Sequence, residues 1–113
     1  MVKAENRLKK RTQFNYLFKH GKSVSVSSLT LVYLPCKAKD YKIGYSVSKK
    51  IGKAVVRNKT KRRLKEAFRK ISSQVLNNHF YVIIPKASIV NLSFDEICSD
   101  VKLVFTKGKL INV

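Results

Sequence analysis

Residues 49–70 constrain the fold more than any other part of this chain. They include eleven Lys or Arg residues and one acidic residue, Glu66. In a helix, residues three or four positions apart share a face, and on that spacing the segment has two separate strips. The cationic strip consists of Asn58, Lys61, Arg62, Lys65 and Arg69, and the apolar strip consists of Leu64, Ala67, Phe68, Ile71 and Val75. The sequence therefore predicts a helix that buries one face in a core and presents positive charge on another.

The positive charge of the whole chain indicates a polyanionic partner. The sequence has 25 basic and 6 acidic residues, and its formal net charge is +19. Like charges gathered on one surface repel one another, and a nucleic acid removes that repulsion. A solvated helix face would normally mix charge signs, but here only Glu66 offsets its basic neighbours. A membrane-surface protein is disfavoured, because no segment combines a broad apolar face with basic flanks.

The pattern along the chain predicts a single RNA-binding domain over residues 1–113, because 44% hydrophobic residues is too many for a disordered basic tail. We expect an α+β sandwich with helices packed on a small sheet. The expected elements are a helix over 13–20, a strand over 23–34 long enough to bend or split in two, a strand over 41–48, a helix over 54–76, a strand over 79–84 and a helix after Ser93. Residues 1–10 are polar and basic, and we expect them to be mobile.

Local signals mark the ends of two helices. Ser93 followed by Glu96 forms a capping-box pattern for the last helix. Thr12 is a suitable N-cap for the first helix, and Gly21 suits a left-handed residue at its end.

Phe14 and Phe18 lie one turn apart on the short first helix. Core packing is the ordinary interpretation of such a pair. The alternative is that they stack on unpaired bases beside a cationic track, as in proteins that bind single-stranded nucleic acid. The sequence leaves both interpretations open.

Groups for catalysis or metal binding are scarce. The six acidic residues are scattered, and no Ser/His/Asp or Cys/His set is visible. Cys36 and Cys98 are far apart and are expected to be free thiols, and His20 and His79 have no neighbours that complete a metal site. We therefore expect no cofactor bound by the protein alone. No apolar run reaches the ~20 residues that span a bilayer and no secretory signal is visible, which favours a cytoplasmic protein.

Residues 46–62 resemble a signature of the bacterial ribonuclease P protein family. They read Ser-Val-Ser-Lys-Lys-Ile-Gly-Lys-Ala-Val-Val-Arg-Asn-Lys-Thr-Lys-Arg. The family has a Ser-Val-Ser-Lys-Lys loop before a helix that starts with Arg-Asn-x-x-Lys-Arg-x-x-Arg. Residues 8–21 also resemble the N-terminal helix of the family, and the order of elements is similar over nearly the whole chain.

The resemblance implies a protein subunit of ribonuclease P. Such a subunit binds the catalytic RNA and the 5′ leader of precursor tRNA, and it assists endonucleolytic removal of the leader while the RNA holds the catalytic Mg²⁺. No membrane and no small-molecule substrate are implied. The implied fold is an α/β sandwich with a mixed sheet and an uncommon left-handed β-α-β crossover, whereas the general rule would favour a right-handed one.

The resemblance also implies two groups of site residues. The RNA-binding residues are Lys49, Lys50, Lys53, Arg57, Asn58, Lys61, Arg62, Lys65 and Arg69. The cleft for the leader is formed by Phe14, Phe18, Tyr33, Ser46 and Ser48.

Two positions depart from the family pattern. Lys65 stands where the signature ends in Arg, which keeps the charge but loses the planar, bidentate geometry toward phosphate. The family's cleft tyrosine corresponds to Val32, and Tyr33 is its neighbour. Because side chains alternate along a strand, this offset turns Tyr33 to the other face unless a bulge near residues 27–28 restores the register.

Two other functions fit the basic pattern. One is a non-catalytic RNA-binding protein of the ribosomal type. The other is a DNA-binding module that inserts the helix over 54–76 into a major groove, but the chain lacks the short partner helix of a helix-turn-helix.

Overall fold

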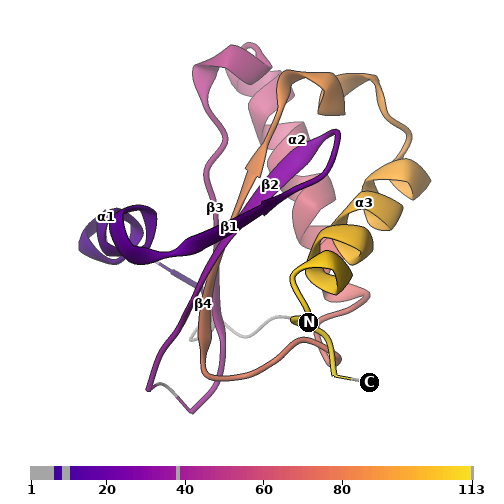
Figure 1. Ribbon diagram of the computed structural model, residues 1–113. Helices are drawn as coiled ribbons and strands as arrows, with labels where there is room; N and C mark the ends of the chain where they lie inside the picture. The colour runs from indigo at the N-terminus through magenta and orange to yellow at the C-terminus, as the bar shows by residue number, and fades with distance from the viewer. Residues whose placement is uncertain (1–6, 9–10, 38, 113) are drawn as a thin grey trace.

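The computed structural model describes residues 7–8, 11–37 and 39–112. The expected mobility of residues 1–10 therefore lies largely outside the described residues. In chain order the elements are α1 (Arg11–His20), β1 (Lys22–Ser25), β2 (Leu29–Pro35), β3 (Lys42–Tyr45), the 3₁₀ helix η2 (Lys49–Ile51), α2 (Ala54–Arg69), β4 (His79–Pro85), the 3₁₀ helix η3 (Ala87–Asn91) and α3 (Phe94–Lys107) (Figure 1). The α+β class and the order of the elements are as predicted.

One mixed sheet with the strand order β1-β2-β4-β3 forms the centre of the molecule. The long strand expected over 23–34 is split, because β1 and β2 form an antiparallel pair on either side of a turn at residues 26–28. Strand β2 pairs antiparallel with β4, whereas β3 pairs parallel with β4. The chain connects β3 to β4 through α2, so the predicted β-α-β crossover unit is present.

The two faces of the sheet are covered by different helices and bury cores of different size. Helices α2 and α3 cover one face and α1 crosses the other (Figure 1). The main core lies under α2 and α3, and its fully buried side chains include Leu29, Leu31, Ile43, Leu64, Phe68, Tyr81, Ile83, Val101, Val104 and Phe105. The α1 face has a small second core, in which the buried side chains are Leu8, Leu17, Val32 and Val82.

The side chains of β2 alternate between the two faces of the sheet as predicted. This alternation places Tyr33 on the face away from the predicted cleft. Val32 packs in the second core, on the α1 face. Tyr33 packs against the main core, on the α2/α3 face, and pairs with Tyr81 in a continuous register. No bulge within β2 returns Tyr33 to the α1 face. The assignment of Tyr33 to a cleft with Phe14 is therefore wrong, because a shift of one residue along a strand changes the face.

Helix α2 ends earlier than expected. Its apolar strip is buried as predicted, but the helix stops at Arg69 and the chain continues through turns. Val75 forms an isolated antiparallel bridge with Ile111, and the Leu76 amide donates to the Leu110 carbonyl at 2.8 Å. These backbone groups pair with the C-terminal segment, so they are not available to a continued helix.

The end signals predicted for α1 are wrong, whereas the capping box predicted for α3 is present. Thr12 lies inside α1, which already includes Arg11, so it is not the N-cap. Gly21 has no positive φ; a Cβ there would stand 2.5 Å from the Leu17 carbonyl oxygen, so glycine is required for close approach. The capping box of α3 is confirmed: the Glu96 amide donates to Ser93 Oγ at 3.2 Å, and the Ser93 amide donates to Glu96 Oε1 at 3.0 Å.

Candidate nucleic-acid interface

The cationic strip of α2 faces solvent along its whole length. All five predicted members, from Asn58 to Arg69, are exposed, while Leu64 and Phe68 on the opposite strip are fully buried. Among the described residues, the only ion pair joins Arg69 Nη2 to Glu66 Oε2 at 2.7 Å. The helix is therefore held by its apolar strip, and most of its positive charge has no acidic partner.

The loop before α2 adds three lysines to this strip. Lys49 and Lys50 lie in η2, Lys53 is the N-cap position of α2, and all three are exposed. Gly52 between them has a φ of 149°, a backbone conformation that glycine adopts without strain. The loop thus carries positive charge to the N-terminal end of α2, where the helix has no acidic residue in its first turn.

Arg57 and Asn58 are not engaged in local capping. Lys53 is the N-cap of α2, so Asn58 lies beyond the cap position and is exposed. Arg57 is half-buried, and its amide makes the ordinary helical bond to the Lys53 carbonyl at 3.0 Å. Neither side chain has a hydrogen-bond partner among the described residues, so both can contact a ligand.

The serines predicted for the cleft lie at the end of β3. The Ser46 amide donates to the Ile83 carbonyl at 3.0 Å, which extends the pairing of β3 with β4 by one residue. By strand alternation Ser46 shares the α1 face with Gly44. Ser48 is exposed and precedes η2 without capping it through its side chain.

Helix α1 brings Phe14 beside this basic surface, and Phe18 lies next to Phe14 on the same helix. The rings of Phe14 and Phe18 are 6.4 Å apart, centroid to centroid. Phe14 is half-buried against the second core, whereas Phe18 is 45% exposed. A Cβ on Gly44 would stand 2.5 Å from Phe14 Cζ, so the ring lies directly on the backbone of β3. Core packing therefore accounts for Phe14 in part, and Phe18 is free to stack.

A pocket of about 220 Å³ joins α1, β3 and α2. Its lining consists of Arg7, Leu8, Phe14, Ile43, Gly44, Tyr45, Lys61 and Lys65. Among the described residues, no acidic side chain lines it. The pocket thus combines the aromatic ring of the predicted leader cleft with two lysines of the predicted RNA-binding helix.

The lysines and Arg7 act on one another electrostatically. The pKa of Lys65 is lowered by its partial burial and, to a smaller extent, by the charges of Lys61 and Arg7. Sequence reasoning missed Arg7, because nothing in the local pattern places it against α2.

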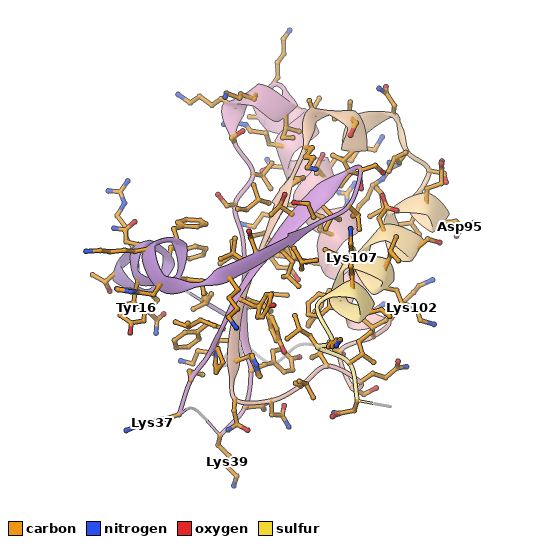
Figure 2. The ribbon with its side chains drawn as sticks, viewed as in Figure 1. Tyr16, Lys37, Lys39, Asp95, Lys102 and Lys107 are labelled. Carbon is orange, nitrogen blue, oxygen red and sulfur yellow. The ribbon has the colours of Figure 1, made fainter. Side chains whose placement is uncertain are left out.

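Negative charge is concentrated on the other side of the molecule. Asp95, Glu96 and Asp100 line a separate pocket on α3. Figure 2 shows Asp95 on the outer side of α3 and Tyr16 on α1 at the opposite side of the molecule. A polyanion would therefore be attracted to the side with α1 and the start of α2.

The described residues show neither a metal-type cluster nor a disulfide. They contain no group of three His, Cys, Asp or Glu side chains that could hold a metal ion, and Cys36 and Cys98 are free thiols. Within the same part of the chain, no helix has the length and apolarity needed to cross a membrane.

Comparisons with known proteins agree over nearly the whole chain. The Ribonuclease P family model matches residues 2–109. The ribonuclease P protein components of Shouchella clausii and Clostridium acetobutylicum are 36% and 38% identical, over 97% and 95% of this chain and 91% and 92% of the relatives. The solved RNase P protein of Staphylococcus aureus has a TM-score of 0.86 at 30% identity and covers 95% of this chain and 98% of its own. The solved RNase P protein of Thermotoga maritima has a TM-score of 0.78 at 29% identity, and the match covers 87% of this chain and 94% of that protein.

Proposed function

The chain belongs to the Ribonuclease P protein family, and from this premise we propose which of its surfaces contact which RNA. As a member, it is the protein subunit of a ribonucleoprotein endoribonuclease that processes the 5′ end of tRNA. Its partner is therefore a ribonuclease P RNA. A non-catalytic protein of the ribosomal type is not favoured.

The basic surface made of η2 and α2 is proposed to bind RNA through its phosphates. Its residues are Lys49, Lys50, Lys53, Arg57, Asn58, Lys61, Arg62, Lys65 and Arg69. Support comes from the exposure of all of them except the half-buried Arg57 and from the shortage of acidic partners, since such cations gain most from phosphate contacts. The catalytic RNA is the proposed partner of this surface as a whole.

The 5′ leader of precursor tRNA is the proposed ligand of the cleft between α1 and the sheet. Phe14 and Phe18 would contact its bases, and Ser46 and Ser48 would lie along its path. One observation carries this assignment: an aromatic ring of α1 and lysines of α2 line the same pocket. Aromatic faces beside a cationic track are the usual arrangement for unpaired nucleotides.

Bond cleavage and the catalytic Mg²⁺ ions are proposed to belong to the RNA. The acidic side chains support this division, because those on α3 lie on the opposite side of the molecule from the proposed cleft. We also propose that the protein and its RNA partners are cytoplasmic.

The leader assignment is tested in the reconstituted holoenzyme with a matched pair of variants. Phe18 and Tyr16 are both exposed aromatic residues of α1, at 45% and 55%, but positions two apart face different sides of a helix. Phe18→Ala should weaken binding of precursor tRNA by roughly 5- to 100-fold, the loss of one stacked base. Binding of mature tRNA should not change, and Tyr16→Ala should affect neither.

Equal losses for precursor and mature tRNA would contradict the leader assignment. The subunit role has its own test, which is 5′ cleavage of precursor tRNA by the cognate catalytic RNA at low Mg²⁺. Addition of the protein should stimulate cleavage, and cleavage that is unaffected by the protein would contradict that role.

A further inference from the structure

Helix α1 has a second pair of rings on the flank that does not face the pocket. The rings of Tyr16 and His20 are 4.5 Å apart between centroids, closer than the 6.4 Å between Phe14 and Phe18. With 3.6 residues in each turn, Tyr16 lies about 200° around the helix from both phenylalanines. Neither Tyr16 nor His20 lines the pocket between α1, β3 and α2. The two ring pairs are therefore on different sides of one helix.

Core packing does not account for this second pair. Tyr16 is 55% exposed and His20 is exposed as well, whereas Leu17 on the core side of α1 is fully buried. Within the described residues, the Tyr16 hydroxyl has no hydrogen-bond partner. The ordinary role of two rings four residues apart is a mutual contact that stabilises the helix slightly. That contact leaves more than half of Tyr16 uncovered, and such a surface gains free energy when a partner covers it.

The charge around the ring pair indicates what kind of partner can cover it. Residues 11–39 include no Asp or Glu. Lys19 lies three positions after Tyr16, the spacing of neighbours on a helix, and Arg11 and Lys22 at the two ends of α1 are exposed too. Figure 2 shows Tyr16 on the opposite side of the molecule from Asp95. The partner must therefore be anionic and must offer flat apolar groups, and a nucleic acid has both.

The position of the pair favours the catalytic RNA over the leader. The leader is proposed to lie against Phe14 and Phe18. From there it would have to cross α1, whose diameter with side chains is about 10–12 Å, to reach Tyr16. The catalytic RNA is the other RNA partner in the proposed function, and it covers the ring pair for as long as the complex exists.

We propose that Tyr16 and His20 stack on one unpaired base of the catalytic RNA, with Lys19 on an adjoining phosphate. The inference rests on the proposed function and adds a contact outside both the basic surface of η2 and α2 and the leader cleft. Helix α1 then lies between two RNAs, with the substrate on one flank and the catalytic RNA on the other. Binding of the catalytic RNA thereby also fixes the helix that carries Phe14 and Phe18.

A crossed comparison with Phe18→Ala tests this assignment. Tyr16→Ala should weaken binding of the protein to its catalytic RNA roughly 5- to 100-fold, the loss of one stacked base. When the holoenzyme is assembled at saturating protein, its binding of precursor and mature tRNA should match the wild type. Phe18→Ala should show the reverse pattern, with unchanged assembly and weaker binding of precursor tRNA.

Two control variants separate stacking from the mere loss of a side chain. Tyr16→Phe keeps the ring and should bind the catalytic RNA within about twofold of the wild type. Leu103→Ala removes an apolar side chain of α3 whose exposure, 52%, is close to the 55% of Tyr16, and it should have no effect. Alanine favours a helix, so thermal unfolding of Tyr16→Ala should stay close to the wild type.

Salt dependence distinguishes the rings from the lysine. Stacking neutralises no phosphate, so Tyr16→Ala should leave the log–log slope of catalytic-RNA binding unchanged, whereas Lys19→Gln should lower it by about 0.7. His20→Ala should weaken the same binding. The double variant with Tyr16→Ala should lose less than the product of the two single losses, because both rings contact one base. Fully independent losses would contradict a shared base.

Chemical probing locates the nucleotide. One unpaired nucleotide of the catalytic RNA should lose its reactivity toward 2′-hydroxyl acylation when the wild-type protein binds. It should become reactive again in the complex with Tyr16→Ala and stay protected with Leu103→Ala. The same reactivity throughout the RNA with Tyr16→Ala and with the wild type would count against the contact.

The failures can be told apart. If the wild-type protein neither binds nor stimulates the catalytic RNA, the proposed function itself fails. If the wild type binds that RNA but Tyr16→Ala binds it equally well, only the contact of the ring pair fails. If Tyr16→Ala instead loses affinity for precursor tRNA in the assembled holoenzyme, and the loss grows with leader length, the pair contacts the leader and the proposal is overturned.

Discussion

The two faces of the sheet differ in how they use their side chains. Under α2 and α3 the main core buries aromatic rings against one another; Phe68, for example, lies 5.5 Å from Phe105 between ring centroids. On the α1 face only a small second core is buried, and Phe18 remains 45% exposed. Most apolar burial therefore stabilises the fold from one side, which leaves the other side available for a ligand.

The chain carries a net charge of +19, and its cationic strip on α2 points to solvent, away from the main core. The exposed rings of Tyr16 and Phe18 lie on α1, where only the small second core is buried. Changes at these exposed side chains should affect binding more than stability, and changes at the buried side chains under α2 and α3 should have the opposite effect.

The largest expected effect is on the stability of the main core. Phe68→Ala should lower the free energy of unfolding by about 3–5 kcal/mol, because the ring is fully buried. Phe18→Ala is the matched change on the other face and should cost under about 1 kcal/mol, since its ring is 45% exposed. Urea denaturation of both variants measures the difference, and equal losses would break the comparison.

Gly44→Ala should have the next largest effect, because it disturbs the α1 face from within. The new methyl group would stand 2.5 Å from Phe14 Cζ, so the ring must move, at a cost of about 1–3 kcal/mol. The double variant Gly44→Ala with Phe14→Leu should recover more than half of the loss in urea denaturation. No recovery would show that the strain lies in the β3 backbone instead.

Ser93→Ala should cost about 1 kcal/mol of stability through loss of the α3 cap. Binding of both RNAs should stay within about twofold, because α3 covers the face away from the proposed cleft. Ser93→Asp preserves a cap acceptor and should be close to wild type in thermal unfolding. A clear RNA-binding defect in Ser93→Ala would mean that the two faces are coupled.

The smallest expected effect is on the pH dependence of stability. Hydrogen bonds from Ser93 lower the pKa of Glu96 below its ordinary value of 4.5. A lowered carboxyl pKa contributes stability that is present above the ordinary value and is lost as the pH falls through the folded-state value. Glu96→Gln keeps a hydrogen-bond acceptor without titrating, so its melting temperature should fall less steeply in acid. Identical acid profiles would show that the cap does not depend on the charge.

Local features of the sequence were sufficient for much of the fold. The capping box at Ser93 and the alternation in β2 depend on residues a few positions apart, and both were predicted correctly. The same alternation predicted that Tyr33 would face away from Val32, which is what the register shows. The resemblance alone suggested a place for Tyr33 in the cleft, and the geometry of the strand overrode it.

Errors occurred where distant segments compete for the backbone. The end of α2 depends on the bridge between Val75 and Ile111, which no helical periodicity reveals. Gly21 was correctly predicted to be a position that needs glycine. The reason is the close approach of Leu17 and Val32 and not a left-handed backbone conformation.

The sequence by itself determined that one helix has a cationic strip and an apolar strip, because helical periodicity is a local property of the chain. It also determined where charge and aromatic rings are plentiful. Only the tertiary structure decided which of them meet. Arg7 reaches Lys61 and Lys65 because the chain before α1 pairs with β3, while α2 crosses from β3 to β4. Contacts between segments so far apart in the sequence depend on strand order and register, and these are fixed only when the whole sheet has formed.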